Sequence, residues 1–267
     1  MKSKYYILIL ISFTIISCEK VIDVDLNNAD PKYVIEATLT DEAGNAKVKI
    51  SLTKNFDEDN SFIGVPGATV NVIESGGPVV PFTETSPGNY EAPSLKGVPG
   101  KTYTLNVSVG SKIFYGTSTM PQRVNMDTVY ITDELLFAET RKTANIEYVD
   151  PAGRGNNYRF IQYVNSMKEN QIYAVNDDYT DGNKINNKLF YFTDTPDDPH
   201  NIKSGDQVKI EMFCIDPEVY KYWYSLSRSA TGSSGQATPA NPVSNLQGGA
   251  LGYFSAHTYQ TKTIVAP

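Results

Sequence analysis

Alternating hydrophobic and polar residues run through the first half of the chain and predict β-strands. The cleanest example is KTYTLNVSVG at residues 101–110, where Tyr103, Leu105, Val107 and Val109 are separated by polar residues. The segments 33–40, 47–53 and 67–75 show the same period of two. This period is typical of antiparallel strands with one face in the core and the other in water.

Turn residues separate these segments at short intervals. Glycine and proline recur in EAGN at 42–45, GGP at 76–78, SPGN at 86–89 and VPG at 98–100. Short strands joined by such turns favour a β-sandwich. We therefore expect a β-sandwich domain over residues 32–120, which ends near Met120-Pro121.

The second half is less regular but still rich in strand patterns, at 144–150, 157–165, 187–194 and 206–216. It predicts a β-rich C-terminal domain over residues 121–267, interrupted by one short helix near 216–229. Asp216 is a good N-cap, and Pro217 and Glu218 suit the first turn. An apolar stripe follows, comprising Val219, Tyr220, Trp223, Leu226 and Ser227. The stripe either covers the sheet of this half, which we favour, or forms a partner-binding face.

A small, polar, Gly/Pro-rich segment at 229–250 follows the helix, and a final strand pattern at 251–265 follows it in turn. A long loop held at both ends in this way is frequently functional. This loop and the aromatic residues beside it are therefore our candidate binding surface. The residues chosen are Trp223, Asn245, Gly248, Gly249, Tyr253 and Phe254.

The N-terminus has the pattern of an export signal. Lys2 and Lys4 precede an apolar stretch at 5–16, which is too short for the ~20 residues of a membrane span. Ser17 and Cys18 then resemble the cleavage site of a bacterial lipoprotein signal. The resemblance implies that residues 1–17 are removed and that Cys18 carries the lipid that anchors the protein. The alternative is an ordinary secretory signal with an incidental cysteine.

Residues 18–31 are expected to form a lipidated tether between membrane and fold. Their acidic residues, Glu19, Asp23 and Asp25, partly resemble the surface-export signal of Bacteroidota lipoproteins, although Lys20 interrupts the pattern. A plain solvated linker is the equal alternative. Both the cell surface and the periplasmic face of the outer membrane therefore stay open as locations.

Charge and cysteine content narrow the possible partners. The net charge is −7, and loss of Lys2 and Lys4 would make it −9, whereas nucleic-acid binding requires a basic surface. We expect no nucleic-acid partner. If Cys18 is lipidated, Cys214 has no disulfide partner, and its place in the run VKIEMFC predicts a buried core thiol.

The residues offer little catalytic chemistry. The chain has two histidines, and the common metalloprotease, serine-hydrolase and phosphate-loop motifs are missing, so we assign no catalytic residue, metal or cofactor. Ser255 and His257 share a strand face but lack a motif that supplies an acid. The segment 177–188 places Tyr179 and Lys188 where a calcium loop requires oxygen ligands.

Several stretches together resemble one family. They include CEKVIDVDL, YVIEATLTDE, GVPGATVNV, the segment 86–109, STMPQRV and NPVSNLQGGALGYFSAHT. The chain is thus similar to Bacteroidota outer-membrane lipoproteins of the domain of unknown function 4249 (DUF4249). Its first half also resembles immunoglobulin-like, carboxypeptidase-regulatory-like sandwiches. Asp127-Thr128-Val129 resembles an acceptor for O-glycosylation at Thr128 in exported proteins of these bacteria.

The resemblance implies a location more than an activity. Its members look like outer-membrane proteins that often accompany TonB-dependent transporters. We therefore expect a non-enzymatic accessory or binding lipoprotein that works with such a transporter, with its ligand unknown. A structural or adhesive surface module is the first alternative, and a surface hydrolase of glycans or peptides is the second.

Overall fold

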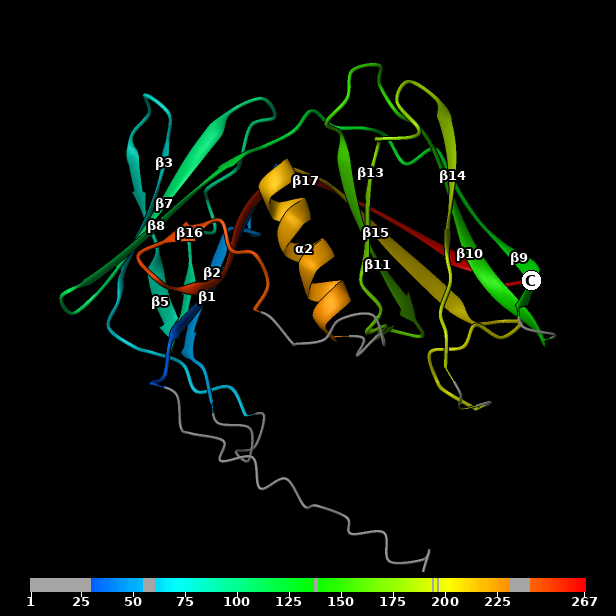
Figure 1. Cartoon of the computed structure of the whole chain (residues 1–267), viewed down its shortest axis with the longest axis horizontal. Coiled ribbons are helices and arrows are strands. Elements are labelled where there is room, and N and C mark those ends of the chain that lie inside the picture. The colour runs from blue at the N-terminus through cyan, green and yellow to red at the C-terminus, as the bar shows by residue number, and fades with distance from the viewer. Residues whose placement is uncertain (1–29, 55–60, 137–138, 194, 196, 231–240) are drawn as a thin grey trace, which may run out of the picture. The chain divides into compact units, whose positions relative to one another are not determined.

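A computed structural model describes residues 30–54, 61–136, 139–193, 195, 197–230 and 241–267. Residues 31–267 form one compact unit. The described part is built from β-strands and a single α-helix, α2 (Figure 1). The mainly β fold class predicted from the sequence is therefore confirmed. The signal segment and Cys18 lie outside the described residues.

Seventeen strands make up three sheets. The first half of the chain supplies β1 (Tyr33–Thr40), β2 (Lys47–Leu52), β3 (Thr69–Glu74), β4 (Val79–Pro81), β5 (Thr83–Ser86), β6 (Asn89–Glu91), β7 (Thr102–Val109) and β8 (Lys112–Thr119). The second half supplies β9 (Thr128–Leu136), β10 (Glu139–Val149), β11 (Asn157–Val164), β12 (Met167–Lys168), β13 (Tyr173–Asn176), β14 (Lys184–Leu189), β15 (Gln207–Ile215), α2 (Pro217–Ala230), β16 (Leu246–Gln247) and β17 (Leu251–Val265).

The last strand, β17, joins the two halves in one nine-stranded sheet. Its first part pairs parallel with β1, from Val34↔Leu251 to Thr40↔His257. Its second part pairs antiparallel with β15, from Cys214↔Thr258 to Gln207↔Val265. The strand order is β12-β11-β15-β17-β1-β2-β6-β5, and β13 also pairs with β11. In Figure 1, β17 passes behind α2 from one lobe of the molecule to the other.

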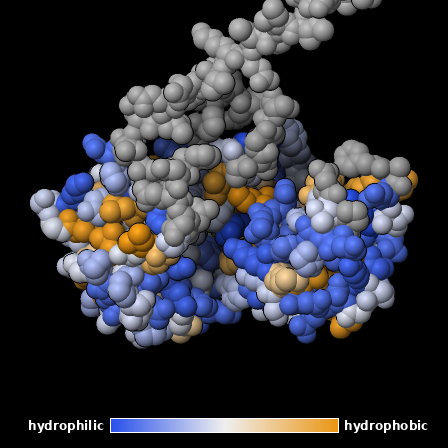
Figure 2. All heavy atoms as spheres, turned by 90° about the horizontal axis from the view of Figure 1, so that it is seen from below, coloured by the Kyte–Doolittle hydropathy of each residue, from blue (hydrophilic) through white to orange (hydrophobic). Residues whose placement is uncertain are grey.

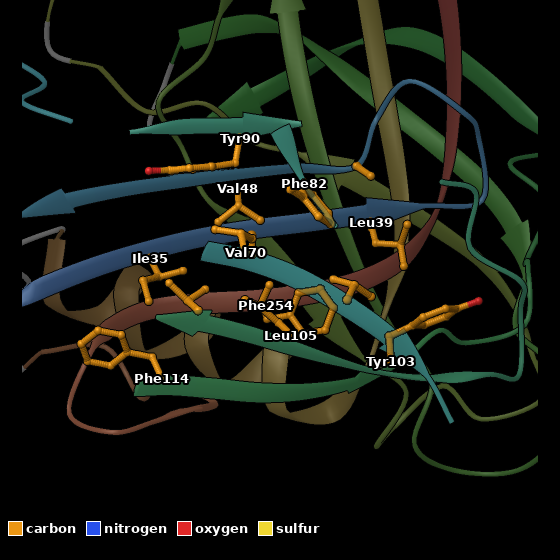
Figure 3. Close-up of a cluster of buried hydrophobic side chains, with 14 of the residues drawn as sticks. Ile35, Leu39, Val48, Val70, Phe82, Tyr90, Tyr103, Leu105, Phe114 and Phe254 are labelled. Carbon is orange, nitrogen blue, oxygen red and sulfur yellow. The ribbon is translucent and has the colours of Figure 1, made fainter. Parts of the chain in front are cut away.

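Two smaller sheets cover one face of this large sheet. The five-stranded sheet β16-β8-β7-β3-β4 encloses the first core, which includes Ile35, Leu105 and Phe254 (Figure 3). The three-stranded sheet β14-β10-β9 encloses the second core, which includes Tyr158 and Met212. The two-domain division near residue 120 stays a prediction, because these cores are distinct but β17 borders both of them.

The helix α2 covers the opposite face of the large sheet. Side chains alternate across a strand, so Tyr253 points away from Phe254 and joins a third core with Val219, Tyr222 and Trp223 of the helix. Buried residues of α2 therefore follow the spacing i, i+3 and i+4. The interpretation that the helical stripe covers the sheet is confirmed, with Tyr222 as a member that the sequence did not indicate.

Burial follows the alternation expected of the strands. Tyr103, Leu105 and Val107 are buried, and so is Cys214, which is a free thiol. Burial raises the pKa of this thiol, so it stays protonated and unreactive at neutral pH. Leu52 departs from the pattern and is 40% exposed, because it is the last residue of β2.

Asp216 fixes the start of α2 and ties it to the first half of the chain. One carboxylate oxygen, Oδ1, accepts the Val219 N–H at 2.9 Å and caps the helix. The other oxygen accepts the Thr119 N–H at 3.2 Å and the Ser118 hydroxyl. The hydroxyl of Ser118 accepts in turn the N–H of Ala256 in β17 at 2.9 Å. One buried carboxylate thus holds β8, α2 and β17 in register.

The face of the described part seen in Figure 2 is mainly hydrophilic, with several hydrophobic patches. Within this part, no helix combines the length and the apolar character needed to cross a bilayer.

Candidate functional site

The six residues of the predicted binding surface lie in different places around β17. Phe254 is buried in the first core, and Asn245, Gly248 and Gly249 lie in the connection that leads to the strand. Trp223 and Tyr253 lie together on the helix side, with ring centroids 5.0 Å apart. The structure therefore does not gather the six into one surface.

Asn245 has a structural role in the connection before β17. Its amide NH₂ donates to the Phe254 carbonyl at 2.7 Å and to the Thr117 carbonyl at 3.2 Å, while its oxygen accepts the Phe254 N–H at 2.9 Å. The side chain thus substitutes for backbone pairing between β8 and β17. It places β16 beside β8, through the pairs Leu246↔Gly116 and Gln247↔Tyr115.

Gly248 and Gly249 complete this connection, both with positive φ. A Cβ on Gly248 would lie 2.3 Å from the Ile113 carbonyl oxygen, so the backbone passes β8 too closely for any side chain. Around Gly249 the same atom would meet open space. The geometry of the 241–250 segment therefore explains its glycines, and residues 231–240 of the predicted loop lie outside the described residues.

An aromatic cluster forms on the helix side of β17. Tyr222 and Trp223 of α2 meet at 5.2 Å between ring centroids, and Tyr222 lies 4.8 Å from Tyr253. All three residues are 8% exposed. Rings packed with these tilted and edge-on geometries stabilise beyond their buried area. The cluster gives the site beside it a rigid aromatic wall.

Arg159 lies against this wall and has no polar partner. It sits in β11 opposite Phe213 of β15, and its guanidinium carbon is 3.4 Å from the centre of the Trp223 ring. Its Nε is buried without a hydrogen-bond acceptor, and its side chain makes no hydrogen bond or ion pair with any described residue. Burial lowers the pKa of Arg159, but an arginine keeps its charge at any physiological pH. The guanidinium is held by stacking alone.

A cavity of about 190 Å³ opens beside Arg159, between α2 and the connection from β12 to β13. Its lining residues are Arg159, Ile161, Lys168, Glu169, Asn170, Gln171, Ile172 and Trp223. Burial and the charge of Arg159 both lower the pKa of Lys168. Two cationic side chains thus converge on a small cavity that also has aromatic and aliphatic walls.

Glu169 is the acidic residue of the cavity lining, and its side chain is buried. Burial raises its pKa to about 8, with a further contribution from Asp198. Gln162 Nε2 donates to one of its oxygens at 2.8 Å, and Tyr173 lies 2.7 Å from the other. Gln162 and Tyr173 share the sheet face of Phe160, which belongs to the second core, so this carboxyl points away from Arg159.

Glu211 lies on the same sheet face as Arg159 but is already engaged by other groups. Lys209 donates to it at 2.8 Å, and the hydroxyls of Tyr163 and Tyr259 each donate at 3.2 Å. Glu211 also favours the charged forms of Arg159 and Lys168 electrostatically, but it makes no hydrogen bond to either. The positive charge of Arg159 and Lys168 remains without a nearby bonded carboxylate among the described residues.

A larger hollow of about 590 Å³ borders β9 and β10, but its charges are paired. Lys142 bonds Asp133 at 3.1 Å, and Arg141 bonds Glu139 at 2.8 Å. Surface pairs of this kind are common and indicate no ligand. The smaller cavity at Arg159 is therefore the stronger candidate.

Ser255 and His257 do come together, as their spacing suggested. The Ser255 hydroxyl lies 2.8 Å from His257 Nδ1, and both residues are buried. Burial and the charge of Arg159 lower the pKa of His257 to about 4, so the imidazole is neutral. Asp41 bonds Arg123 at 2.5 Å and accepts the Tyr259 N–H at 2.8 Å. The Ser255–His257 pair is enclosed in the sheet. Asp41 is already bonded to Arg123 and Tyr259.

Three carboxylates meet at the turn after β13, within the segment that does not fit a calcium loop. Atoms of Asp150, Asp177 and Asp181 lie within 4.8 Å of one another, and Asp177 is 1% exposed. Backbone N–H groups of Gly153, Gly155 and Gly182 donate to them, one to each carboxylate. These donors stabilise the negative charges and hold the turn against the segment 150–156. Asp150 lies too far from the turn in sequence for the calcium-loop pattern to have included it.

Thr128, the predicted glycosylation site, is exposed at the first position of β9. The side chain is thus accessible, and its modification stays a prediction. Cys18 lies outside the described residues, so lipidation stays a prediction too.

The fold and the cavity define a class: a β-rich protein with one helix among its described residues, which encloses a small cationic and aromatic cavity. A family model, Domain of unknown function (DUF4249), matches residues 19–263, nearly the whole chain. The protein belongs to this family, as its motifs suggested. No curated protein matches the sequence.

Proposed function

We propose that this protein is a non-enzymatic binding component, anchored to the outer membrane by lipid on Cys18, which serves a TonB-dependent transporter. The observation that carries binding is the cavity beside α2, where Arg159 stacks on Trp223 without a polar partner. Buried charges are normally paired. An unpaired guanidinium in a cavity is thus a site built for something that arrives from outside.

The anchor and the transporter rest on the sequence. The apolar segment 5–16 followed by Ser17 and Cys18 supports lipidation, which would confine the protein to a membrane surface. Resemblance to outer-membrane lipoproteins supports a transporter as partner. A binding protein held beside a transporter raises the local concentration of its ligand there.

The test is affinity purification of the tagged protein from its own membranes in mild detergent. We expect a TonB-dependent transporter to copurify, and we expect metabolic labelling with a fatty acid to mark the protein. A Cys18→Ser variant is the matched control and should lose both the label and the membrane fraction. Recovery of the labelled lipoprotein alone would contradict the transporter part of the proposal.

A further inference from the structure

The charge of Arg159 defines what the cavity is suited to bind. The guanidinium has five N–H donors in a planar fork, and its buried Nε has no acceptor among the described residues. Leaving such a donor unsatisfied costs more than an average hydrogen bond contributes. A replacement of the same shape without charge would avoid this cost, but it would also lose the cation–π contact with Trp223.

Lys168 adds a second positive charge to the same cavity. Its exposed side chain comes from β12 at the edge of the sheet, where partial desolvation and then the charge of Arg159 lower its pKa. Two cations that converge on one small space repel each other. An anion in the cavity would convert this repulsion into attraction.

The hydrogen bonds of Tyr173 support a neutral Glu169 on the opposite face of the sheet. Its hydroxyl lies 3.0 Å from the Phe190 carbonyl and 2.7 Å from Glu169 Oε1. The hydroxyl has only one hydrogen, and the Phe190 carbonyl can only accept. A protonated Glu169 satisfies both contacts, because it donates to the Tyr173 oxygen while Tyr173 donates to Phe190. The cavity therefore keeps the positive charge of Arg159 and Lys168.

Size and wall chemistry limit the anion. A cavity of roughly 150 Å³ accommodates a benzene molecule, and this one measures about 190 Å³. The side chains of Ile161, Ile172 and Trp223 offer apolar contacts, while Asn170 and Gln171 offer polar ones. The space fits a carboxylate with a small ring or a short carbon chain, or the end group of a larger acid.

We propose that this cavity binds the carboxylate of a small organic acid or of an acidic sugar, with Arg159 as the principal contact and Lys168 at the entrance. The inference rests on the proposed binding function and gives the ligand its chemical class. A planar guanidinium matches the two oxygens of a carboxylate. The Trp223 ring, on which Arg159 stacks, keeps the fork in place before the ligand arrives.

The chain itself provides the reporter for a test, because Trp223 is its only tryptophan. Galacturonate is titrated into the full chain while tryptophan fluorescence is recorded, with succinate as a second carboxylate. Galactose is the matched neutral sugar, and inorganic phosphate is the alternative oxyanion. We expect saturable fluorescence changes with at least one of the two carboxylates and none with galactose. Tighter binding of phosphate than of both carboxylates would overturn the carboxylate assignment.

Variants then identify the contact residues. Arg159→Met keeps a long apolar side chain against Trp223, and we expect it to weaken carboxylate binding about tenfold or more. Lys168→Met should weaken it by a smaller factor. Lys112→Met removes a positive charge from the first half of the chain and is the matched control, with unchanged affinity expected.

Stability without ligand separates a binding role from a structural one. If Arg159 is present for a ligand, Arg159→Met should melt at the same temperature as the wild type or higher, because removal of the unsatisfied Nε offsets the lost cation–π contact. A clearly lower melting temperature, with carboxylate binding unchanged, would overturn the inference.

The outcome is independent of the transporter test. Copurification of a transporter without any carboxylate response would leave the proposed function in place and overturn the ligand class. Carboxylate binding without copurification of a transporter would support the ligand class and contradict the transporter part of the proposed function.

Discussion

The two faces of β17 show how differently the two sides of one sheet are used. On one face, Phe254 and Ala256 pack into the first core, which is lined by aliphatic and aromatic side chains (Figure 3). On the other face, Tyr253, Ser255 and His257 lie among rings, hydroxyls and charges. The backbone is the same, so the difference arises only from alternate side chains.

This contrast separates stability from binding. The first face buries apolar surface, which is the main favourable term in folding. The second face buries groups that each need a partner, and it leaves Arg159 Nε without one. Unsatisfied groups cost stability. Because Arg159 lies beside α2 and the cavity, the helix side is the one shaped by a requirement other than folding.

The largest expected effect is at Gly252, where β17 passes β1. A Cβ there would lie 2.1 Å from the Ile35 carbonyl oxygen, and the φ of +97° disfavours any side chain. Because both faces of β17 depend on this pairing, Gly252→Ala should remove the cooperative thermal unfolding transition.

Gly249→Ala is the control for this prediction. It has a similar φ of +86° but open space around the new Cβ, so it should cost only about 1–3 kcal/mol. Equal melting temperatures for the two variants would show that the close approach at Gly252 is not the cause.

The second effect concerns pH and Glu169. Its pKa rises from 4.5 to about 8 in the folded protein, because burial disfavours the charge. Below pH 4.5 both folded and unfolded chains hold the proton and stability is complete. As the pH rises to 8, only the unfolded chain ionises, so the folded state loses stability, by at most roughly 5 kcal/mol.

Glu169→Gln should remove this loss, since an amide keeps donors and acceptors for Tyr173 and Gln162 but does not ionise. Urea unfolding at pH 4 and pH 9 measures the effect. The unfolding free energy of the variant should rise relative to that of the wild type as the pH rises. An equal change with pH for both proteins would contradict a buried neutral Glu169. The neighbouring Asp198 and Tyr191 are unchanged and serve as the common background.

The third effect compares the two faces of β17 directly. Phe254→Ala opens a cavity in the first core and should cost about 3–5 kcal/mol in the free energy of unfolding. Tyr253→Phe removes only a hydroxyl that no described residue bonds, so we expect a change below about 0.5 kcal/mol. Chemical denaturation measures both changes. A large loss of unfolding free energy for Tyr253→Phe would show that the hydroxyl on the helix side is important for stability.

The smallest effect is at Asp216, which links β8 to the helix. Asp216→Asn keeps the oxygen that caps Val219, but its NH₂ group cannot accept from Ser118 and Thr119. We expect a loss of about 1–3 kcal/mol in unfolding free energy. Ser118→Ala removes one of the same contacts. The double variant should therefore lose less unfolding free energy than the sum of the two single losses. Simple additivity would show that the two residues act independently.

Much of the fold could be predicted from the sequence because it is determined locally. The alternation at Tyr103–Val109 and the cap at Asp216 both act over a few residues, and the structure confirms them. The division of β17 between two partners could not be predicted. Its two halves pair with β1 and β15, which lie far apart in the chain, and alternation does not indicate which strand is the neighbour.

For the same reason, only part of the candidate site could be predicted from the sequence. Trp223 and Tyr253 stood out as aromatic residues near a long loop, but nothing in the run NYRFIQYVN indicated Arg159 as part of a site. One signal was available: Arg159 alternates with Tyr158 and Phe160 in a strand whose other positions are mostly apolar. Only the placement of α2 over β11 makes this position half-buried.

The position of β17 at the end of the chain sets the order in which the protein can fold. Phe254 and Ala256 complete the first core, and the Tyr259 N–H bonds Asp41 across 218 positions of sequence. A chain still emerging from a ribosome or an export channel therefore cannot close its first sandwich, however early those strands appear. Such long-range pairing is slow. The first sandwich stays open until β17 is available.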